Sequence, residues 1–464
     1  MKPILIRGCL LVFAFSALAV EPVKPGPFLV GVCTHFSQGK GLLAANLSLI
    51  RQAGARSIRD EVVWRGVEAE KGQLKMPADW ATFVKRAAAE GLDPMLILDY
   101  GSKFYDGGDK PRSEEAIEAF TRYSEFVVRT FKGVVRHYEV WNEWDIKIGG
   151  GTPGSAEDYV RLIRKVYPRI KAVDPSIIVY GGGMTPSGVN NGWLEKMLAG
   201  GALPFMDVVS IHTYNYGRPG RERTPEAWAE WMQKVQDLIA KHNGGKQAPL
   251  YITEMGWPTQ LDKRGMPPRL SADFLARMYL LSRTMPFMKG IWWYDFQDDG
   301  WRAEYNEANF GIVRPDLTPK PSYFAMASVA ELVSKAEYLG RVDTGDADVY
   351  VLKFRMPARR EVWAVWSAHA DDDWQVTLKA PQANPKPLTL KQVGGGGVER
   401  PWGTRNWAEE KGAPVLGGEM TLVVRGAPWL VAGDLSGVTV SGVRQRPFPE
   451  ASRVAVETTA PPKP

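Results

Sequence analysis

The feature that most constrains the fold is a regular alternation of short apolar runs and amphipathic stretches that continues to about residue 335. The apolar runs lie at 28–33, 55–64, 94–100, 134–143, 177–182, 208–214, 249–254 and 289–296. The 3.6-residue spacing of helices recurs at about 77–90, 113–131, 156–173, 225–243 and 270–285, and a last helix is expected to begin near Pro321. Eight strand-then-helix units are what a (β/α)8 barrel requires, whereas a doubly wound sheet usually has fewer repeats. We therefore predict an α/β fold with a TIM barrel over residues 25–335.

The sequence pattern changes after residue 335. Segments such as 348–355, 361–368 and 420–426 are typical of short alternating strands separated by turn residues. Because no helical spacing interrupts them, we predict a small antiparallel β-sandwich domain at 336–435, which we expect to buttress the barrel. The remaining segment, 436–464, is Pro-rich and polar and is predicted to be a disordered tail.

Residues 1–19 have a basic start, an apolar run too short to cross a bilayer, and the ending Ala17-Leu18-Ala19. This pattern predicts a signal peptide and a secreted or periplasmic protein with no membrane span after cleavage. Its removal lowers the formal charge from +6 to +4 and leaves Cys33 as the single cysteine. The exported chain then cannot form an internal disulfide, and its charge is too diffuse to indicate nucleic acid binding.

Polar side chains collect where the predicted strands end, which in a barrel is the face that carries function. The fourth strand ends on Asn142-Glu143 and the seventh on Glu254. The ends of these strands face each other across a barrel mouth, so we expect the two carboxyl groups to lie about 5–5.5 Å apart. Cleavage of a glycosidic bond requires at least one protonated and one ionised carboxyl group at about this spacing. Glu139 lies on the same side of strand four but deeper, and we expect it to form a buried ion pair.

These motifs resemble the retaining glycoside hydrolases of clan A, above all its families 39 and 5. The resemblance rests on "WNEW" at 141–144, "HTY" at 212–214 and "ITEMGWP" at 252–258, and it spans residues 27–335. It implies that Glu143 is the acid/base and Glu254 the nucleophile. It also implies that Asn142 binds the 2-hydroxyl of the sugar. No metal or organic cofactor is required for this chemistry.

The resemblance implies further roles around the two glutamates. Tyr214 would donate to the nucleophile, and the charge of Arg59 would lower the nucleophile's pKa. Either Trp292 or Trp293 would form the platform under the sugar, and strand parity leaves both open. His212 is placed in the site by its position at the mouth.

Two more tryptophans are candidates for sugar stacking, because flat apolar rings pack on the C–H faces of sugars. Trp144 and Trp257 fall in or beside the loops that follow strands four and seven. Trp144 is also a departure from the resemblance, since many members of the clan carry Pro there. The expected partner of the chain is a β-linked oligo- or polysaccharide, and we expect a monomer.

Two alternatives come from other functional classes. Gly39-x-Gly41-x-x-Ala44, with Asp60 and Glu61 about 20 positions on, meets the dinucleotide-binding fingerprint of an oxidoreductase. Residues 34–38 intervene, however, between the predicted strand and the first of these glycines. The other alternative is a carbohydrate-binding protein on an inactive barrel, which the loss of either catalytic Glu would have favoured.

Overall fold

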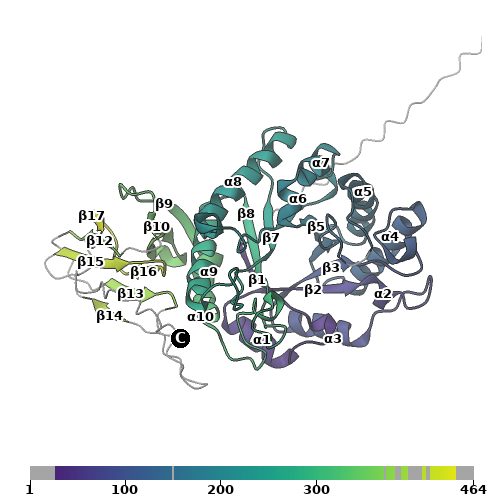
Figure 1. Cartoon of the computed structure of the whole chain (residues 1–464), viewed down its shortest axis with the longest axis horizontal. Helices are drawn as coiled ribbons and strands as arrows, with labels where there is room; N and C mark the ends of the chain where they lie inside the picture. The colour runs from purple at the N-terminus through teal and green to yellow at the C-terminus, as the bar shows by residue number, and fades with distance from the viewer. Residues whose placement is uncertain are drawn as a thin grey trace, which may run out of the picture.

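The structure, a computed structural model, describes residues 27–148, 151–369, 373–381, 388–394, 410–413 and 418–445. The predicted signal peptide and the part of the predicted tail after residue 445 lie outside the described residues. The described chain forms two domains, an N-terminal α/β barrel and a C-terminal all-β domain (Figure 1). No helix of the described ranges has both the length and the apolar character needed to span a membrane.

Eight parallel strands close into a barrel in chain order, with β1 paired to β8. They are β1 (Leu29–Cys33), β2 (Ser57–Val63), β3 (Asp93–Asp99), β4 (His137–Val140), β5 (Ile178–Met184), β6 (Val208–His212), β7 (Leu250–Met255) and β8 (Met288–Trp293). Nearly every residue of these strands is buried, which explains why most of the strands are largely apolar in sequence. The prediction of a TIM barrel is confirmed.

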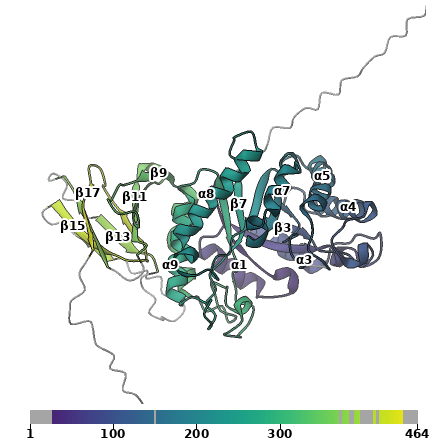
Figure 2. The ribbon, with the colours of Figure 1, turned by 45° about the horizontal axis from the view of Figure 1, so that its top comes forward.

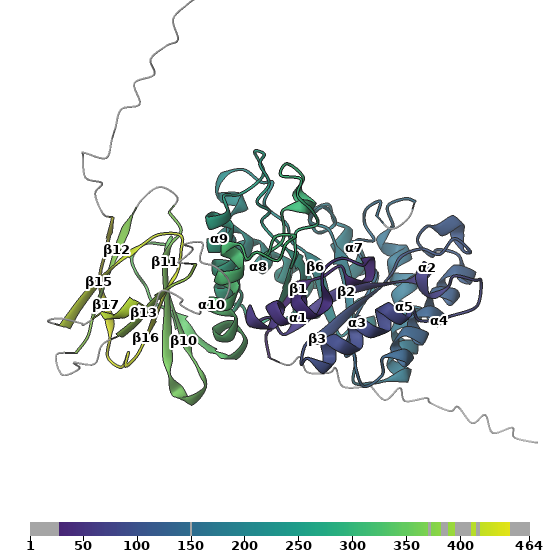
Figure 3. The ribbon, with the colours of Figure 1, turned by 90° about the horizontal axis from the view of Figure 1, so that it is seen from below.

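Helices cover the outside of the barrel (Figure 3). They are α1 (Leu43–Gln52), α2 (Trp64–Val67), α3 (Ala78–Ala89), α4 (Glu114–Thr130), α5 (Ala156–Val173), α6 (Pro186–Asn190), α7 (Trp193–Ala199), α8 (Pro225–His242), α9 (Pro268–Ser282) and α10 (Pro321–Lys335). The hydroxyls of Ser113, Ser155 and Thr224 cap α4, α5 and α8 by accepting a backbone N–H of the first turn. Helices α1, α2, α6 and α7 lie outside the predicted helical ranges, and each is shorter than the predicted helices.

The C-terminal domain consists of two antiparallel sheets, with strand orders β14-β13-β16-β11-β10-β9 and β15-β12-β17. Its strands are β9 (Glu337–Arg341), β10 (Val349–Arg355), β11 (Glu361–Ser367), β12 (Trp374–Lys379), β13 (Leu388–Gln392), β14 (Glu410–Ala413), β15 (Glu419–Val424), β16 (Trp429–Ala432) and β17 (Thr439–Gln445). The predicted β-sandwich is confirmed. Strand β17 extends the domain past residue 435, into the predicted tail. Its side chains are mostly exposed because it is an edge strand, so it lacks the apolar alternation that marks the others.

One sheet of the sandwich also packs against the barrel (Figure 2). Along β10 and β11, Val351 and Val365 face the core of the sandwich, while Leu352 and Trp366 join the large core of the barrel. The Trp366 indole N–H donates to Glu226 of α8 at 3.1 Å, and Arg277 of α9 pairs with the same carboxylate. This buried charge pair and the shared apolar core attach the β domain to the barrel, in the way that the expected buttress requires.

Candidate active site

The chain reverses sharply just after β4. Trp141 and Glu143 have φ values of 70° and 50°, a left-handed conformation that costs residues with side chains about 1–3 kcal/mol each. The backbone N–H of Glu143 donates to the carbonyl of Gly183 on β5 at 2.9 Å, which fixes the turn. As a result, Trp141 is buried in the hydrophobic core, while the two following side chains, Asn142 and Glu143, line a cavity. Strained backbone of this kind is concentrated at functional sites.

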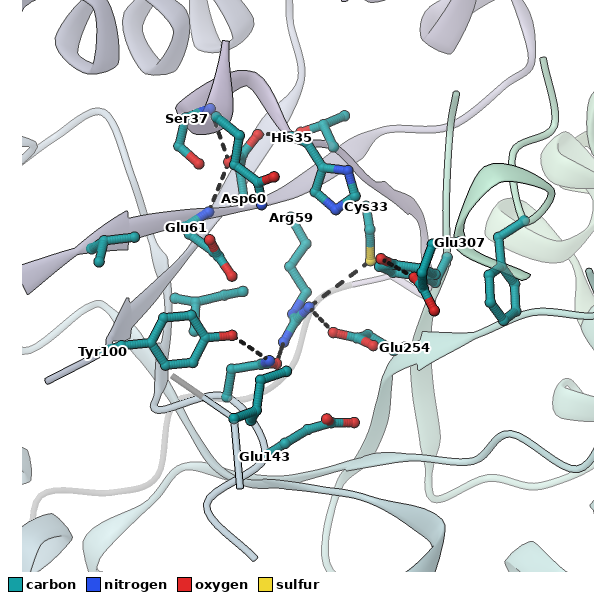
Figure 4. Close-up of a pocket in the computed structure, with 18 of the residues that line it drawn as sticks. Cys33, His35, Ser37, Arg59, Asp60, Glu61, Tyr100, Glu143, Glu254 and Glu307 are labelled. Carbon is teal, nitrogen blue, oxygen red and sulfur yellow. Dashed lines mark hydrogen bonds and ion pairs between the residues drawn. The ribbon is translucent and has the colours of Figure 1, made fainter. Parts of the chain in front are cut away.

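This cavity, of about 800 Å³, lies at the C-terminal ends of the barrel strands (Figure 4). Five of the residues predicted for the site line it: Arg59, Asn142, Glu143, Tyr214 and Glu254. They come from four different strands, so only the closed barrel brings them together.

Glu254, at the end of β7, is buried among groups that favour its ionised form. One carboxylate oxygen accepts from Arg59 Nη1 at 2.7 Å, and the other accepts from the Tyr214 hydroxyl at 2.7 Å. Burial opposes ionisation, but the charges of His212 and Arg59 and the hydrogen bond from Tyr214 outweigh it and lower the pKa of Glu254. Glu254 is therefore available as a carboxylate nucleophile.

Arg59 is the buried centre of the site. Its Nε donates to Glu139 at 2.8 Å and its Nη2 to the amide oxygen of Asn142 at 2.8 Å, in addition to the contact with Glu254. Glu139 is fully buried and lies deeper in the barrel, in the ion pair that the sequence predicts. The guanidinium thus holds Glu254 and Asn142 in one fixed arrangement.

Glu143 has a different environment from Glu254. Its Oε1 lies 2.9 Å from His212 Nδ1, and the same nitrogen lies 3.5 Å from Glu254. Burial raises the pKa of Glu143 above its usual range, although His212 partly offsets the effect. A carboxyl group whose pKa is raised is suited to donate a proton.

The two carboxyl groups lie close to each other. An oxygen of Glu143 and an oxygen of Glu254 are within 4.8 Å, with His212 Nδ1 between them. Retaining glycosidases separate their carboxyl groups by about 5–5.5 Å, and inverting ones by roughly 6.5–9.5 Å. The observed separation of the two carboxyl groups fits the short spacing of retaining glycosidases and not the long spacing of inverting ones.

Comparisons with known proteins agree with this geometry. No family model and no curated protein matches the sequence. Among solved structures, a family 39 glycoside hydrolase from Bacteroides cellulosilyticus WH2 matches with a TM-score of 0.71 and 27% identity, over 88% of this chain and 81% of its own. Together with the paired glutamates, this match decides the class of enzyme. The chain is a glycosidase.

Two more distant structures share the fold. A monomeric beta-xylosidase from Caulobacter crescentus CB15 has a TM-score of 0.64 at 17% identity, covering 88% of this chain and 96% of that one. A family 5 glycoside hydrolase from Streptomyces cattleya, solved in complex with GlcNAc, has a TM-score of 0.55 at 14% identity, covering 67% and 81%. The resemblance to clan A, with its families 39 and 5, is confirmed.

We expect the glycosidase to lose substantial stability in the variant Arg59→Met. The substitution leaves the buried carboxylates Glu139 and Glu254 without their cation, which should cost about 3–5 kcal/mol in the free energy of unfolding. Urea denaturation measures the loss. Adding Glu139→Gln to the variant should recover part of it, because one of the two uncompensated charges is removed. A stability of Arg59→Met equal to that of the wild type would contradict this view of the site.

The variant His212→Gln should shift the pH profile of the glycosidase. Carboxylates on both sides favour the charged imidazole, and this charge lowers the pKa of Glu143 and of Glu254. Without it both pKa values rise, so activity is lost at a higher pH on the acid side, where Glu254 must be ionised. On the basic side, where Glu143 must be protonated, activity persists to higher pH. The pH dependence of kcat/KM measures both limbs, and His242→Gln at the end of α8 serves as the control, which should leave them in place.

The four tryptophans predicted to bind sugar do not line the cavity. Trp292 points into the barrel but one layer too deep, where its ring packs above Gly31 with Tyr180 and Tyr251. Trp293 points outward and packs on Trp257. Trp144 and Trp257 are fully buried, and their indole N–H groups donate to the backbone carbonyls of Ser155 and Arg223. The prediction that Trp144, Trp257 and Trp292 or Trp293 contact the sugar is therefore wrong, because all four rings belong to the core.

Several residues that the sequence analysis leaves out of the site do line the cavity. Tyr294 continues the inward side of β8 beyond Trp292, and its hydroxyl donates to Glu307 at 2.9 Å. Tyr100, after β3, accepts a hydrogen bond from the amide of Asn142 at 2.9 Å. Because Tyr294 lies two residues after Trp292, the alternation of side chains along β8 puts both on the inner side of the barrel. How deep each side chain lies depends on the register between neighbouring strands, which the sequence does not give.

The dinucleotide alternative is not supported by the structure. Residues 34–42 separate β1 from α1, so the tight strand-to-helix turn of that fingerprint is absent from this described segment. The Asp60 carboxylate, which would bind a ribose, instead accepts the backbone N–H groups of Phe36 and Ser37 and the hydroxyl of Thr34. Asp60 therefore organises the loop after β1.

Proposed function

We propose that this protein is an exported retaining β-glycosidase that acts on a β-linked oligo- or polysaccharide by double displacement. Glu254 attacks the anomeric carbon while Glu143 protonates the departing glycosidic oxygen, which gives a covalent glycosyl-enzyme. Glu143, now ionised, then takes a proton from water, and that water attacks the anomeric carbon and releases Glu254. Two inversions at the same carbon leave the product with the configuration of the substrate.

The observation that carries the proposal is the opposite tuning of two neighbouring carboxyl groups. Arg59 and Tyr214 hold Glu254 in the ionised form, whereas burial favours the protonated form of Glu143 less than 4.8 Å away. This is the pair of charge states with which the first displacement must begin. As Glu254 is consumed in the covalent intermediate, its negative charge disappears, which makes it easier for Glu143 to lose its proton.

An apolar floor for the sugar is supplied by tyrosine and phenylalanine in place of the expected tryptophan. The ring of Tyr294 packs edge-on against Phe310 at 5.3 Å and Tyr214 at 6.1 Å, and all three line the cavity. We assign to Tyr294 the platform under the sugar at the cleavage point. We assign the binding of the 2-hydroxyl to Asn142, which is held by Arg59 and Tyr100.

The test is hydrolysis of a panel of 4-nitrophenyl β-glycosides and β-linked polysaccharides. Xylose derivatives and xylan belong in the panel because one structural neighbour is named a beta-xylosidase. Proton NMR of the first product formed should show the β-anomer, which mutarotates only later. Formation of the α-anomer first would contradict the retaining mechanism. Binding of a panel member without any turnover would instead indicate a carbohydrate-binding protein on an inactive barrel.

A further inference from the structure

The cavity continues well beyond the two catalytic glutamates. Its volume of about 800 Å³ is in the upper range of ligand sites and exceeds what one sugar ring fills. The second half of the cavity is lined by the loop after β1, by one residue of β2, by α2 and by one residue of α3: Ser37, Gln38, Glu61, Arg65, Gly66 and Trp80. None of these residues takes part in the two displacements described above.

Trp80 is the one large flat side chain of this second half. Its indole N–H donates to the carbonyl of Ser37 at 3.0 Å, which fixes the orientation of the ring. The ring lies directly against Gly66, where an added Cβ would come within 2.5 Å of Trp80 Cη2. The ring is only partly buried, so it contributes to the cavity wall as well as to the core. A rigid, partly exposed indole beside a glycine is a ready platform for the C–H face of a sugar.

Two charged side chains that can hydrogen-bond to sugar hydroxyl groups line the same part of the cavity as Trp80. Arg65 is exposed, and across the described ranges no hydrogen bond or ion pair engages its guanidinium. The Glu61 carboxylate also lines the cavity, as does Tyr100, whose hydroxyl accepts from the amide of Asn142 at 2.9 Å.

The second half lies on the side of the cavity away from the leaving group. Glu143 protonates the departing oxygen, so the leaving group must lie on the side of Glu143. Figure 4 shows Ser37 and Glu61 on the opposite side of Arg59 from Glu143. A sugar bound there would be joined to the non-reducing side of the unit that is cleaved.

We propose that Trp80, with Glu61 and Arg65, forms a second sugar subsite on the non-reducing side of the cleaved bond. The inference rests on the proposed function and deepens it, because it makes a chain of at least two β-linked sugars before the cleaved bond the preferred substrate. Trp80 supplies the stacking surface, and the two charged side chains bind hydroxyl groups. Gly66 is required because any larger residue would displace the ring.

The experiment compares kcat/KM for 4-nitrophenyl β-xyloside and 4-nitrophenyl β-xylobioside, or for the corresponding mono- and disaccharide pair of whichever sugar the panel selects. The wild type should prefer the bioside. In Trp80→Ala the ratio of the two kcat/KM values should fall about tenfold, the loss of one good stacking contact, mainly through KM of the bioside. Gly66→Ala should lower the ratio similarly, since its φ is outside the left-handed region and only the ring must move. Trp80→Phe should restore most of the preference.

Gly442→Ala on β17 is the matched control, because an added Cβ there meets no atom within 4 Å, and it should keep the wild-type ratio. Equal kcat/KM for both substrates in the wild type, or an unchanged ratio in a folded Trp80→Ala or Gly66→Ala variant, would overturn the subsite while leaving the glycosidase intact. A wild type that hydrolyses no glycoside of the panel would instead overturn the proposed function, and the subsite with it.

Discussion

In the variant Glu254→Gln, kcat should fall by roughly four orders of magnitude or more, which corresponds to about 5.5 kcal/mol of lost transition-state stabilisation. The amide is nearly the same size as the carboxylate. Its oxygen can still accept from Arg59, and its NH2 group can donate to the hydroxyl oxygen of Tyr214, so the fold should be kept. It cannot, however, attack the anomeric carbon. Turnover of 2,4-dinitrophenyl glycosides measures the loss, because these substrates need no acid and report on the attack alone. Circular dichroism verifies the fold.

Glu307→Gln is the matched control for the nucleophile. Glu307 also lines the cavity, but its carboxylate is hydrogen-bonded by Tyr294 and Asn306, and burial raises its pKa. It is therefore a poorer nucleophile than Glu254, and its amide variant should lose far less activity. A loss in Glu307→Gln that matched the loss in Glu254→Gln would mean that the nucleophile has been assigned to the wrong carboxylate.

The variant Glu143→Ala should separate substrates by their leaving groups. Without a general acid, cleavage of an unactivated oligosaccharide should slow by roughly 10²- to 10⁴-fold. Cleavage of a 2,4-dinitrophenyl glycoside should form the glycosyl-enzyme at nearly the normal rate, because this leaving group departs without a proton. Kinetics across a series of aryl glycosides of decreasing leaving-group ability measure the effect.

Azide provides a second readout for Glu143→Ala. The small anion fits the space left by the side chain and needs no general base, so it should attack the glycosyl-enzyme and give a β-glycosyl azide. An equal loss of rate for good and poor leaving groups, with no azide product, would show that Glu143 is not the acid/base.

The sequence could predict most of the catalytic centre because a closed barrel fixes where strand ends meet. Once Glu143 and Glu254 are placed after strands four and seven, they must face the same mouth, and Arg59 and Tyr214 follow from the same rule. The buried partner of Arg59, Glu139, could also be predicted, since the period of two along a strand sets its side and its depth. The order of the strands and the alternation of side chains along them are enough to place these residues.

The aromatic residues could not be predicted in this way. Trp292 has the correct parity but lies one layer below the mouth, and only the register with Gly31 of β1 sets its depth. Trp144 and Trp257 follow strands, yet their rings turn into the layer between strands and helices, where burial of a large apolar surface stabilises them. Trp80 lies on a helix, away from any strand end, and it reaches the cavity only because Gly66 leaves room for its ring.

The most direct test of the central claim, that Glu254 becomes covalently glycosylated, is mass spectrometry of the enzyme inactivated by a 2,4-dinitrophenyl 2-deoxy-2-fluoro-β-glycoside. The fluorine slows both displacements and the leaving group accelerates the first, so the intermediate should accumulate. We expect one fluorosugar per chain, attached within the peptide that contains Glu254, and slow recovery of activity as water releases it. A label on Glu143, Glu307 or another side chain, or turnover without any covalent adduct, would contradict the account.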